Sequence, residues 1–131
     1  MLLLGEPGAG KSDLALRLID RGAKLVADDQ VELSRKGREV LAASPKNIAG
    51  LIEVRGVGIF RMRAKKTAPV LLVVQLEESV ERLPHPESYE CLGAHLPLLR
   101  LNPFEPSAVI KVEMAVNALQ DGSLKVGAFK E

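Results

Sequence analysis

The chain begins with a short apolar run and then changes to a helical pattern. Residues 1–4 are continuously apolar, which is typical of a strand inside a sheet. After a glycine-rich segment, apolar residues recur four positions apart, at Leu14, Ala15, Leu18 and Ile19. This spacing predicts a helix that starts at Ser12, buries one face and ends at Arg21 and Gly22.

Short apolar runs separated by polar turns fill the middle of the chain, and they predict strands. Residues 23–27 form one such run, which ends at two aspartates. Residues 31–34 and 39–42 flank the sequence RKGR and predict a hairpin. Residues 51–59 predict a strand that two glycines bend or bring close to a neighbour, and residues 69–76 predict a buried strand.

The last third of the chain combines a loop-rich stretch with a second helix. Residues 77–101 contain prolines at 84, 86 and 97, which argue against a long helix. Residues 108–119 have a helical pattern, with Ser107 placed as the N-cap and Asp121 and Gly122 as the stop. The chain is therefore expected to hold few helices.

The glycine-rich segment carries the clearest chemistry. Residues 5–12 read G-E-P-G-A-G-K-S and match the phosphate-binding pattern G-x4-G-K-[ST] of a P-loop. Backbone N–H groups of such a loop, together with the helix N-terminus, point at one position and favour an anion there. The residues expected to contact a nucleotide are Gly5, Glu6, Pro7, Gly8, Ala9, Gly10, Lys11 and Ser12.

Two side chains of the loop have specific expected roles. Lys11 is expected to bind the β- and γ-phosphates, and the Ser12 hydroxyl is expected to ligate Mg²⁺. Pro7 removes one N–H group from the loop. A strand, this loop and a helix in series predict an α/β fold: a single P-loop-containing domain over residues 1–131, with a central mixed β-sheet and few helices.

Composition narrows the possible partners. Of 131 residues, 18 are Lys or Arg and 17 are Asp or Glu, so a net charge of +1 gives no general attraction to nucleic acid or anionic membranes. Three Phe, one Tyr and no Trp provide little surface for stacking along a nucleic-acid strand. One cysteine and no membrane-length apolar run indicate a cytoplasmic protein.

Asp28 and Asp29 come directly after the apolar run of residues 23–27. Polar groups at the carboxyl end of a strand lie where α/β sheets bind their ligands. Adjacent carboxylates at a strand end point to different sides, so one can hold a metal while the other takes a proton from an incoming hydroxyl. The alternative is a solvated turn, in which Asp is also common.

Glu53 and Arg55 form a second pair of interest. Two positions apart in a strand, they would lie on one face. The carboxylate would suit Mg²⁺ and the guanidinium would suit a phosphate. A surface ion pair on a half-exposed strand explains the same residues.

Three segments together resemble HPr kinase/phosphorylase, the bacterial enzyme that phosphorylates a serine on the phosphocarrier protein HPr. They read GEPGAGKSD, LVADDQVEL and LIEVRGVGI, and SAVIKVEMAVNAL is similar to the late helix of that family. The resemblance covers roughly residues 2–119.

The resemblance implies a Mg-ATP-dependent serine kinase. It implies that Lys11 binds phosphate, that Ser12 and Glu53 ligate Mg²⁺, and that Asp29 is the base for the acceptor serine, with Asp28 beside it. Arg55 lies in the segment that matches the catalytic signature of the family. The implied partners are ATP, Mg²⁺ and HPr, and the implied assembly is a hexamer.

The departures from the family pattern concern acceptor handling and phosphorolysis. Pro7 replaces a serine, Cys91 replaces an arginine in Y-E-C-L-G, and residues 104–106 replace a Gly-Arg-Asn motif. The family also has a histidine upstream of the loop that residues 1–4 do not reach, so the first strand is expected to be incomplete. Kinase activity is therefore expected over phosphorylase activity. The alternatives are a non-catalytic nucleotide-sensing module and a P-loop kinase of a small metabolite.

Overall fold

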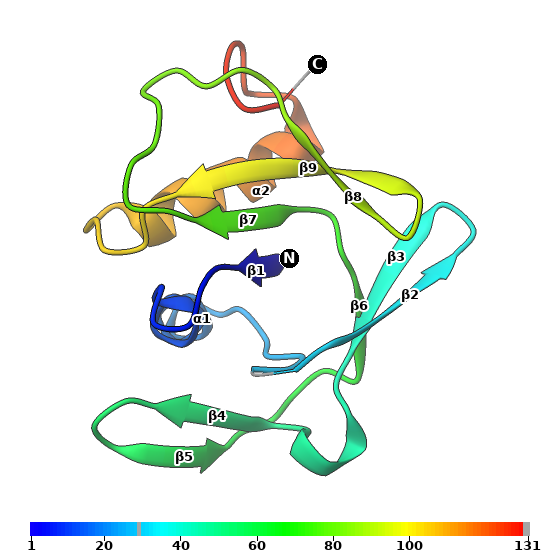
Figure 1. The fold of residues 1–131 in the computed structure, drawn as a ribbon, viewed down its shortest axis with the longest axis vertical. Coiled ribbons are helices and arrows are strands. Elements are labelled where there is room, and N and C mark those ends of the chain that lie inside the picture. The colour runs from blue at the N-terminus through cyan, green and yellow to red at the C-terminus, as the bar shows by residue number, and fades with distance from the viewer. Residues whose placement is uncertain (29, 130–131) are drawn as a thin grey trace. The chain divides into compact units, whose positions relative to one another are not determined.

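The computed structural model describes residues 1–28 and 30–129 of the chain (Figure 1). Within this part there are two α-helices, one 3₁₀ helix and nine strands. In chain order these elements are β1 (Leu2–Leu4), α1 (Lys11–Asp20), β2 (Glu32–Lys36), β3 (Glu39–Ala43), η1 (Lys46–Ile48), β4 (Leu51–Val54), β5 (Gly58–Arg61), β6 (Thr67–Pro69), β7 (Val73–Leu76), β8 (Ser88–Cys91), β9 (Ala94–Leu101) and α2 (Ala108–Asp121).

The first of two compact units combines Met1–Lys11 with the described residues from Leu71 onward. It contains a four-stranded sheet in the order β1-β7-β9-β8. β1 and β9 both run parallel to β7, whereas β8 runs antiparallel to β9. The prediction of an α/β fold with a central mixed sheet and few helices is therefore confirmed.

Helix α2 lies along β9 in this unit (Figure 1). Its buried side chains are Ala108, Val109, Val112 and Ala115, which recur on one face at helical spacing. The helix is confirmed and extends to Asp121, and the N–H of Gly122 donates to the Ala118 carbonyl at 2.9 Å to end it. Ser107 precedes the helix as predicted, but its side chain makes no capping hydrogen bond.

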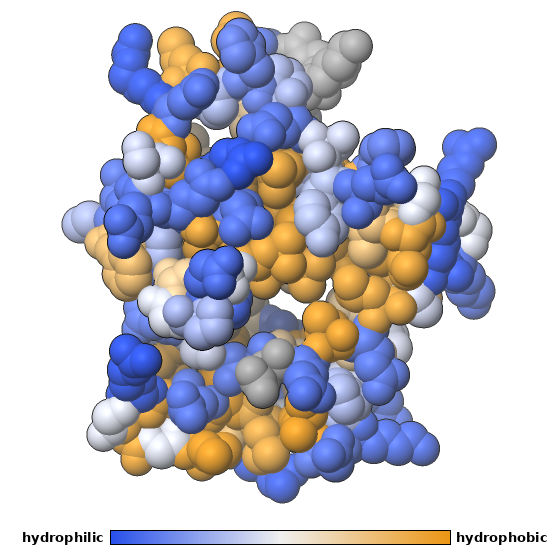
Figure 2. Space-filling view, in the orientation of Figure 1, coloured by the Kyte–Doolittle hydropathy of each residue, from blue (hydrophilic) through white to orange (hydrophobic). Residues whose placement is uncertain are grey.

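The second unit spans Ser12–Val70. It contains most of α1, the antiparallel sheet β2-β3-β6 and the hairpin β4-β5. The predicted helix and the predicted β2–β3 hairpin are confirmed, and Leu14 and Leu18 are buried as the four-residue spacing predicts. Apolar side chains also reach the surface of this unit at the β4–β5 hairpin, where Val57 and Ile59 are 70% exposed (Figure 2).

The strand predicted over residues 23–27 is reduced to one bridge. Only Leu25 pairs, in a parallel bridge with Ala64, and its carbonyl accepts the Lys65 N–H at 2.7 Å. Leu25 is also the one buried residue of this run. A stretch with a single buried side chain gains too little from packing to pair along its whole length.

The single strand predicted over residues 51–59 is a hairpin. Strand β4 ends at Val54, residues 55–57 turn, and β5 starts at Gly58. Gly56 has φ +84°, a backbone conformation that suits a turn and interrupts a strand. The two glycines therefore mark a reversal of the chain, and the prediction of one bent strand was wrong.

The strand predicted over residues 69–76 is split between two sheets. Pro69 pairs with Leu41 in β6, an edge strand of the sheet β2-β3-β6, and β7 begins at Val73. Because proline has no N–H to donate, it is tolerated at such an edge. The apolar run is continuous across the split, so its composition alone does not reveal the break.

A hairpin missed by sequence reasoning occupies residues 88–101. The prolines do exclude a helix here, but β8 and β9 pair through a two-residue turn at Leu92 (φ 51°) and Gly93 (φ 81°). The usual sequence signal for such a turn is Asn-Gly or Asp-Gly, and leucine is uncommon with positive φ. Pro97 lies inside β9, opposite Ser88, which disguises the strand further.

Among residues 1–28 and 30–129, neither helix is both long and apolar enough to cross a lipid bilayer.

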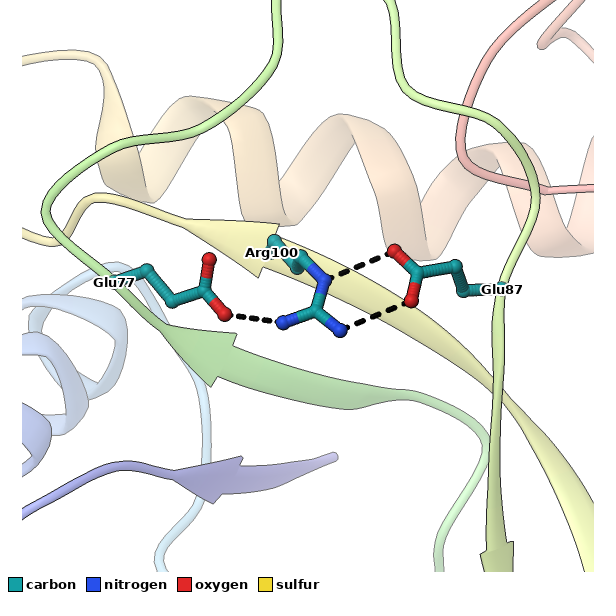
Figure 3. A network of polar contacts seen from close by, with 3 residues as sticks. All are labelled: Glu77, Glu87 and Arg100. Atoms are coloured by element: carbon teal, nitrogen blue, oxygen red, sulfur yellow. Dashed lines mark hydrogen bonds and ion pairs between the residues drawn. The ribbon is translucent and has the colours of Figure 1, made fainter.

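Arg100 of β9 holds both ends of the long connection between β7 and β8. Its Nε and Nη2 atoms donate to the two carboxylate oxygens of Glu87, each at 2.9 Å, and Nη1 pairs with Glu77 (Figure 3). The first contact is the bidentate arrangement that a guanidinium and a carboxylate form best. This hydrogen bond to Arg100 is the main reason that the pKa of Glu87 lies below its ordinary value.

Replacing this arginine with glutamine (Arg100→Gln) is expected to lower the unfolding temperature in a pH-dependent way. A carboxyl group whose pKa is lower in the folded state stabilises the fold above its ordinary value of 4.5, and this contribution is lost as the pH falls through the lowered pKa. The loss of stability should therefore be present at pH ~7 and largely absent at pH ~3, and it should be modest because the pair is exposed. Calorimetric unfolding at both pH values, with Arg82→Gln in the same connection as the control, measures it. An equal loss at the two pH values would contradict the role of Glu87.

Candidate phosphate-loop and metal site

The glycine-rich loop directly follows β1 and leads into α1. A turn closes it, because the Ala9 N–H donates to the Glu6 carbonyl at 2.9 Å. A Cβ atom on Gly5 would lie 2.9 Å from the Ala9 Cβ, closer than real side chains approach. Gly5 is therefore required by space, and the loop folds tightly back on itself at its first residue.

Gly10 is restricted in two ways. Its φ is +99°, which side chains rarely adopt, and a Cβ atom there would lie 3.2 Å from the Pro103 side chain. The same Cβ would lie 3.4 Å from the ring of Phe104. The segment after β9 thus packs directly on the phosphate loop, a contact that the sequence did not indicate.

Lys11 is the first residue of α1, and its ammonium group is directed at the loop. Nζ donates a hydrogen bond to the Gly5 carbonyl oxygen, six residues earlier in the chain. The positive charge is therefore held across the loop, between its two ends. This is where a cation would meet the oxygens of a phosphate cradled by the loop's N–H groups.

Ser12, Asp28 and the backbone of Glu53 are brought together in the second unit. The Ser12 Oγ donates to Asp28 Oδ1 at 2.7 Å, and the Glu53 backbone N–H donates to Asp28 Oδ2 at 3.0 Å. One carboxylate thus joins the start of α1 to β4. The boundary between the two units falls between Lys11 and Ser12, so the lysine belongs to the first unit and the serine to the second.

These oxygens fit the ligand preference of Mg²⁺. Magnesium binds hard oxygen ligands and typically takes one or two from the protein, the rest coming from phosphates and water. The Ser12 hydroxyl and the Asp28 carboxylate supply two such oxygens 2.7 Å apart. No group of three His, Cys, Asp or Glu side chains converges on a metal position within residues 1–28 and 30–129, so a cage made by the protein alone is not formed there.

Two predicted site residues, Arg55 and Asp29, are not confirmed at their predicted positions. Arg55 lies in the exposed turn after β4, so the prediction that it shares a strand face with Glu53 was wrong. The reversal at the glycine that follows it explains the difference. Asp29, the predicted base, lies outside the described residues.

Cys91 is the last residue of β8 and is buried, with 8% of its surface exposed. The sequence Y-E-C-L-G therefore forms the end of β8 and the turn to β9, whereas the sequence predicted a loop for this stretch. An arginine at this position would need a different environment, because a guanidinium is rarely buried without a partner.

Comparison with known proteins identifies the family. The profile of the HPr Serine kinase C-terminal domain matches residues 1–120. The HPr kinase/phosphorylase of Caldicellulosiruptor bescii is 36% identical over 141 residues, covering 97% of this chain and 45% of the relative. That of Prosthecochloris aestuarii is 40% identical over 133 residues, covering 91% of this chain and 39% of the relative. The chain thus spans less than half the length of these relatives.

A solved structure supports the fold. The structure of the Hpr(Ser) kinase/phosphatase from Coxiella burnetii superimposes with a TM-score of 0.80 at 24% sequence identity, covering 92% of this chain and 87% of that chain. The family profile reaches from the strand before the phosphate loop to the last turn of α2. The prediction of a single domain over residues 1–131 stays a prediction. The chain belongs to the family of the HPr Serine kinase C-terminal domain.

Proposed function

We propose that this chain carries a Mg-ATP-dependent kinase site that phosphorylates a serine of HPr or of an HPr-like phosphocarrier protein. The observation that carries the proposal is the contact between the Ser12 hydroxyl and the Asp28 carboxylate. In the sequence Ser12 follows Lys11, whose ammonium group donates across the glycine-rich loop. A phosphate cradle, a cation and a pair of metal-binding oxygens are the parts that phosphoryl transfer requires.

Each part has a role in positioning ATP. The N–H groups of Gly8 and Gly10 and those of the first turn of α1 would bind the phosphates, because the Ala9 N–H already donates to the Glu6 carbonyl. Lys11 would exchange the Gly5 carbonyl for phosphate oxygens. Ser12 and Asp28 would hold Mg²⁺, with Glu53 as a further ligand in the proposal. The ion would supply positive charge opposite the negatively charged phosphates.

Asp29 is the proposed base. Asp28 already accepts hydrogen bonds on both of its oxygens, from Ser12 and from Glu53. In the proposal, as the resemblance implies, the carboxylate of Asp29 accepts the proton of the acceptor serine. The serine oxygen then bonds to the γ-phosphorus as the bond from this phosphorus to the bridging oxygen breaks and ADP leaves.

The proposed assembly rests on the resemblance, and the proposed location rests on the single cysteine and the short apolar runs of the sequence. We propose a cytoplasmic homo-oligomer, a hexamer by resemblance, in which HPr is the protein substrate. Arg55, exposed in the turn of the β4–β5 hairpin, is available to a phosphate or to the partner protein. Phosphorylase activity is expected to be weak, because Pro7 and Cys91 replace the serine and arginine that the resemblance associates with acceptor and phosphate handling.

A second candidate is a nucleotide-sensing module without catalysis. Cys91 favours it, because a small buried thiol cannot replace the charge of an arginine in an active site. Such a module would keep the phosphate loop and the Ser12–Asp28 pair, since both serve nucleotide binding.

Transfer of labelled phosphate from ATP to purified HPr tests the proposal. We expect transfer by the unaltered chain, and a rate about 100-fold lower in Asp29→Asn, which lacks the base. Nucleotide binding without transfer would contradict the kinase and favour the sensing module. Turnover that requires a small metabolite instead of HPr would favour a metabolite kinase.

A further inference from the structure

An aromatic ring lies beside the phosphate loop and remains open to solvent. The ring of Phe104, in the segment between β9 and α2, would contact a Cβ atom on Gly10 at 3.4 and 3.5 Å. The side chain is nevertheless 65% exposed. Because the ring buries only a minor part of its surface, packing of the core does not explain a phenylalanine at this position.

The backbone around this ring is fixed by hydrogen bonds. The Phe104 N–H donates to Asn102 Oδ1 at 3.0 Å, and Asn102 Nδ2 donates to the Glu78 carbonyl at 3.1 Å. Pro103, the residue between them, is less than 2% exposed. On the other side, Lys111 Nζ lies 2.8 Å from Glu105 Oε1. The ring is thus presented from an anchored segment, and little ordering would be needed for it to bind a ligand.

We propose that Phe104 is the stacking platform for the base of the nucleoside triphosphate whose phosphates bind at residues 5–11. The inference rests on the proposed function, because it takes the loop to be a nucleotide site. The base of a nucleotide is a flat aromatic group. The exposed ring of Phe104 lies against the phosphate loop, so a base can stack on it while the phosphates bind to the loop.

The platform recognises the face of the base and not its edge. Asn102 uses one donor and one acceptor of its amide within the protein, so these are not available to the hydrogen-bonding edge of a base. Every base has a π-face, and stacking therefore discriminates little between adenine and guanine. The affinities for ATP and GTP should depend on Phe104 to a similar extent.

Binding of ATP and of inorganic tripolyphosphate by titration calorimetry tests this role. Phe104→Ala should weaken ATP binding about 10-fold, because it removes the stacking partner, and should leave tripolyphosphate binding within about 2-fold. Met114→Ala is the matched control: Met114 is 66% exposed on α2 in the same unit and should leave both affinities unchanged. In Phe104→Trp, which introduces the only tryptophan of the chain, ATP should quench the fluorescence and tripolyphosphate should not.

Three results would overturn the platform. Unchanged ATP affinity in Phe104→Ala, with tripolyphosphate still bound, would exclude it and leave the proposed function intact. Equal weakening of both ligands would show that Phe104 supports the loop and not the base. Failure of the unaltered chain to bind either ligand would refute the phosphate site and the platform together.

Discussion

Replacing Lys11 with methionine (Lys11→Met) should lower phosphoryl transfer from ATP about 1,000-fold, which is the effect of removing one preorganised charge from a transition state. The ammonium group donates to the Gly5 carbonyl across the loop, so it lies at the position where phosphate oxygens would arrive. Methionine keeps much of the length and apolar character of the side chain but has no charge. The initial rate of labelled phosphate transfer at saturating ATP measures the loss.

The same substitution at Lys36, which is exposed on β2, serves as the control for Lys11→Met. Lys36→Met removes an identical charge from the sheet β2-β3-β6 and should leave the transfer rate unchanged. Unfolding temperatures of both variants should stay close to that of the unaltered chain, because Lys11 donates only one hydrogen bond to a carbonyl. Transfer at an undiminished rate by a folded Lys11→Met would contradict the assignment of the phosphate loop.

Replacing Asp28 with asparagine (Asp28→Asn) should have an effect of similar size for a different reason. The carboxylate accepts the Ser12 hydroxyl at 2.7 Å and the Glu53 N–H at 3.0 Å. Asparagine has the same shape and retains one oxygen acceptor, but it loses the negative charge that would bind Mg²⁺ in the proposed site. Metal stabilisation is worth several kcal/mol, so transfer should fall about 1,000-fold.

Asp20→Asn is the matched control for this substitution, because Asp20 is an exposed aspartate at the end of α1. It should retain full transfer. A high concentration of Mg²⁺ should restore part of the activity of Asp28→Asn if the defect is weak metal binding. Full activity of Asp28→Asn at low Mg²⁺ would show that its contact with Ser12 serves only the fold.

The strand, glycine-rich loop and helix at the start of the chain could be predicted from the sequence because their requirements are local. Gly5 and Gly10 are fixed by close approach and by backbone conformation, and Lys11 and Ser12 follow at a set spacing. The two α-helices could be predicted equally well, because their buried residues recur with the helical period. Both features depend on residues that are neighbours in the chain.

The rest of the site depends on pairings between distant segments. The turn at Gly56 moves Arg55 off the strand, and the same apolar, β-branched composition fits one strand or two. The β8–β9 turn uses Leu92 with positive φ, an unusual residue for that conformation. Phe104 and Gly10 lie close together although they are 94 residues apart in the chain, and no local sequence pattern predicts such a contact. Asp29 remains a prediction based on resemblance.

The effect of Mg²⁺ on ATP affinity is the most direct test of the central claim, that the loop and the Ser12–Asp28 pair form a magnesium–nucleotide site. Titration calorimetry of ATP should be performed with Mg²⁺ and with the ion chelated, on the unaltered chain and on Asp28→Asn. We predict that Mg²⁺ strengthens ATP binding to the unaltered chain by at least about 10-fold and that most of this gain is lost in Asp28→Asn. An equal gain in both proteins, or no gain in the unaltered chain, would contradict the account.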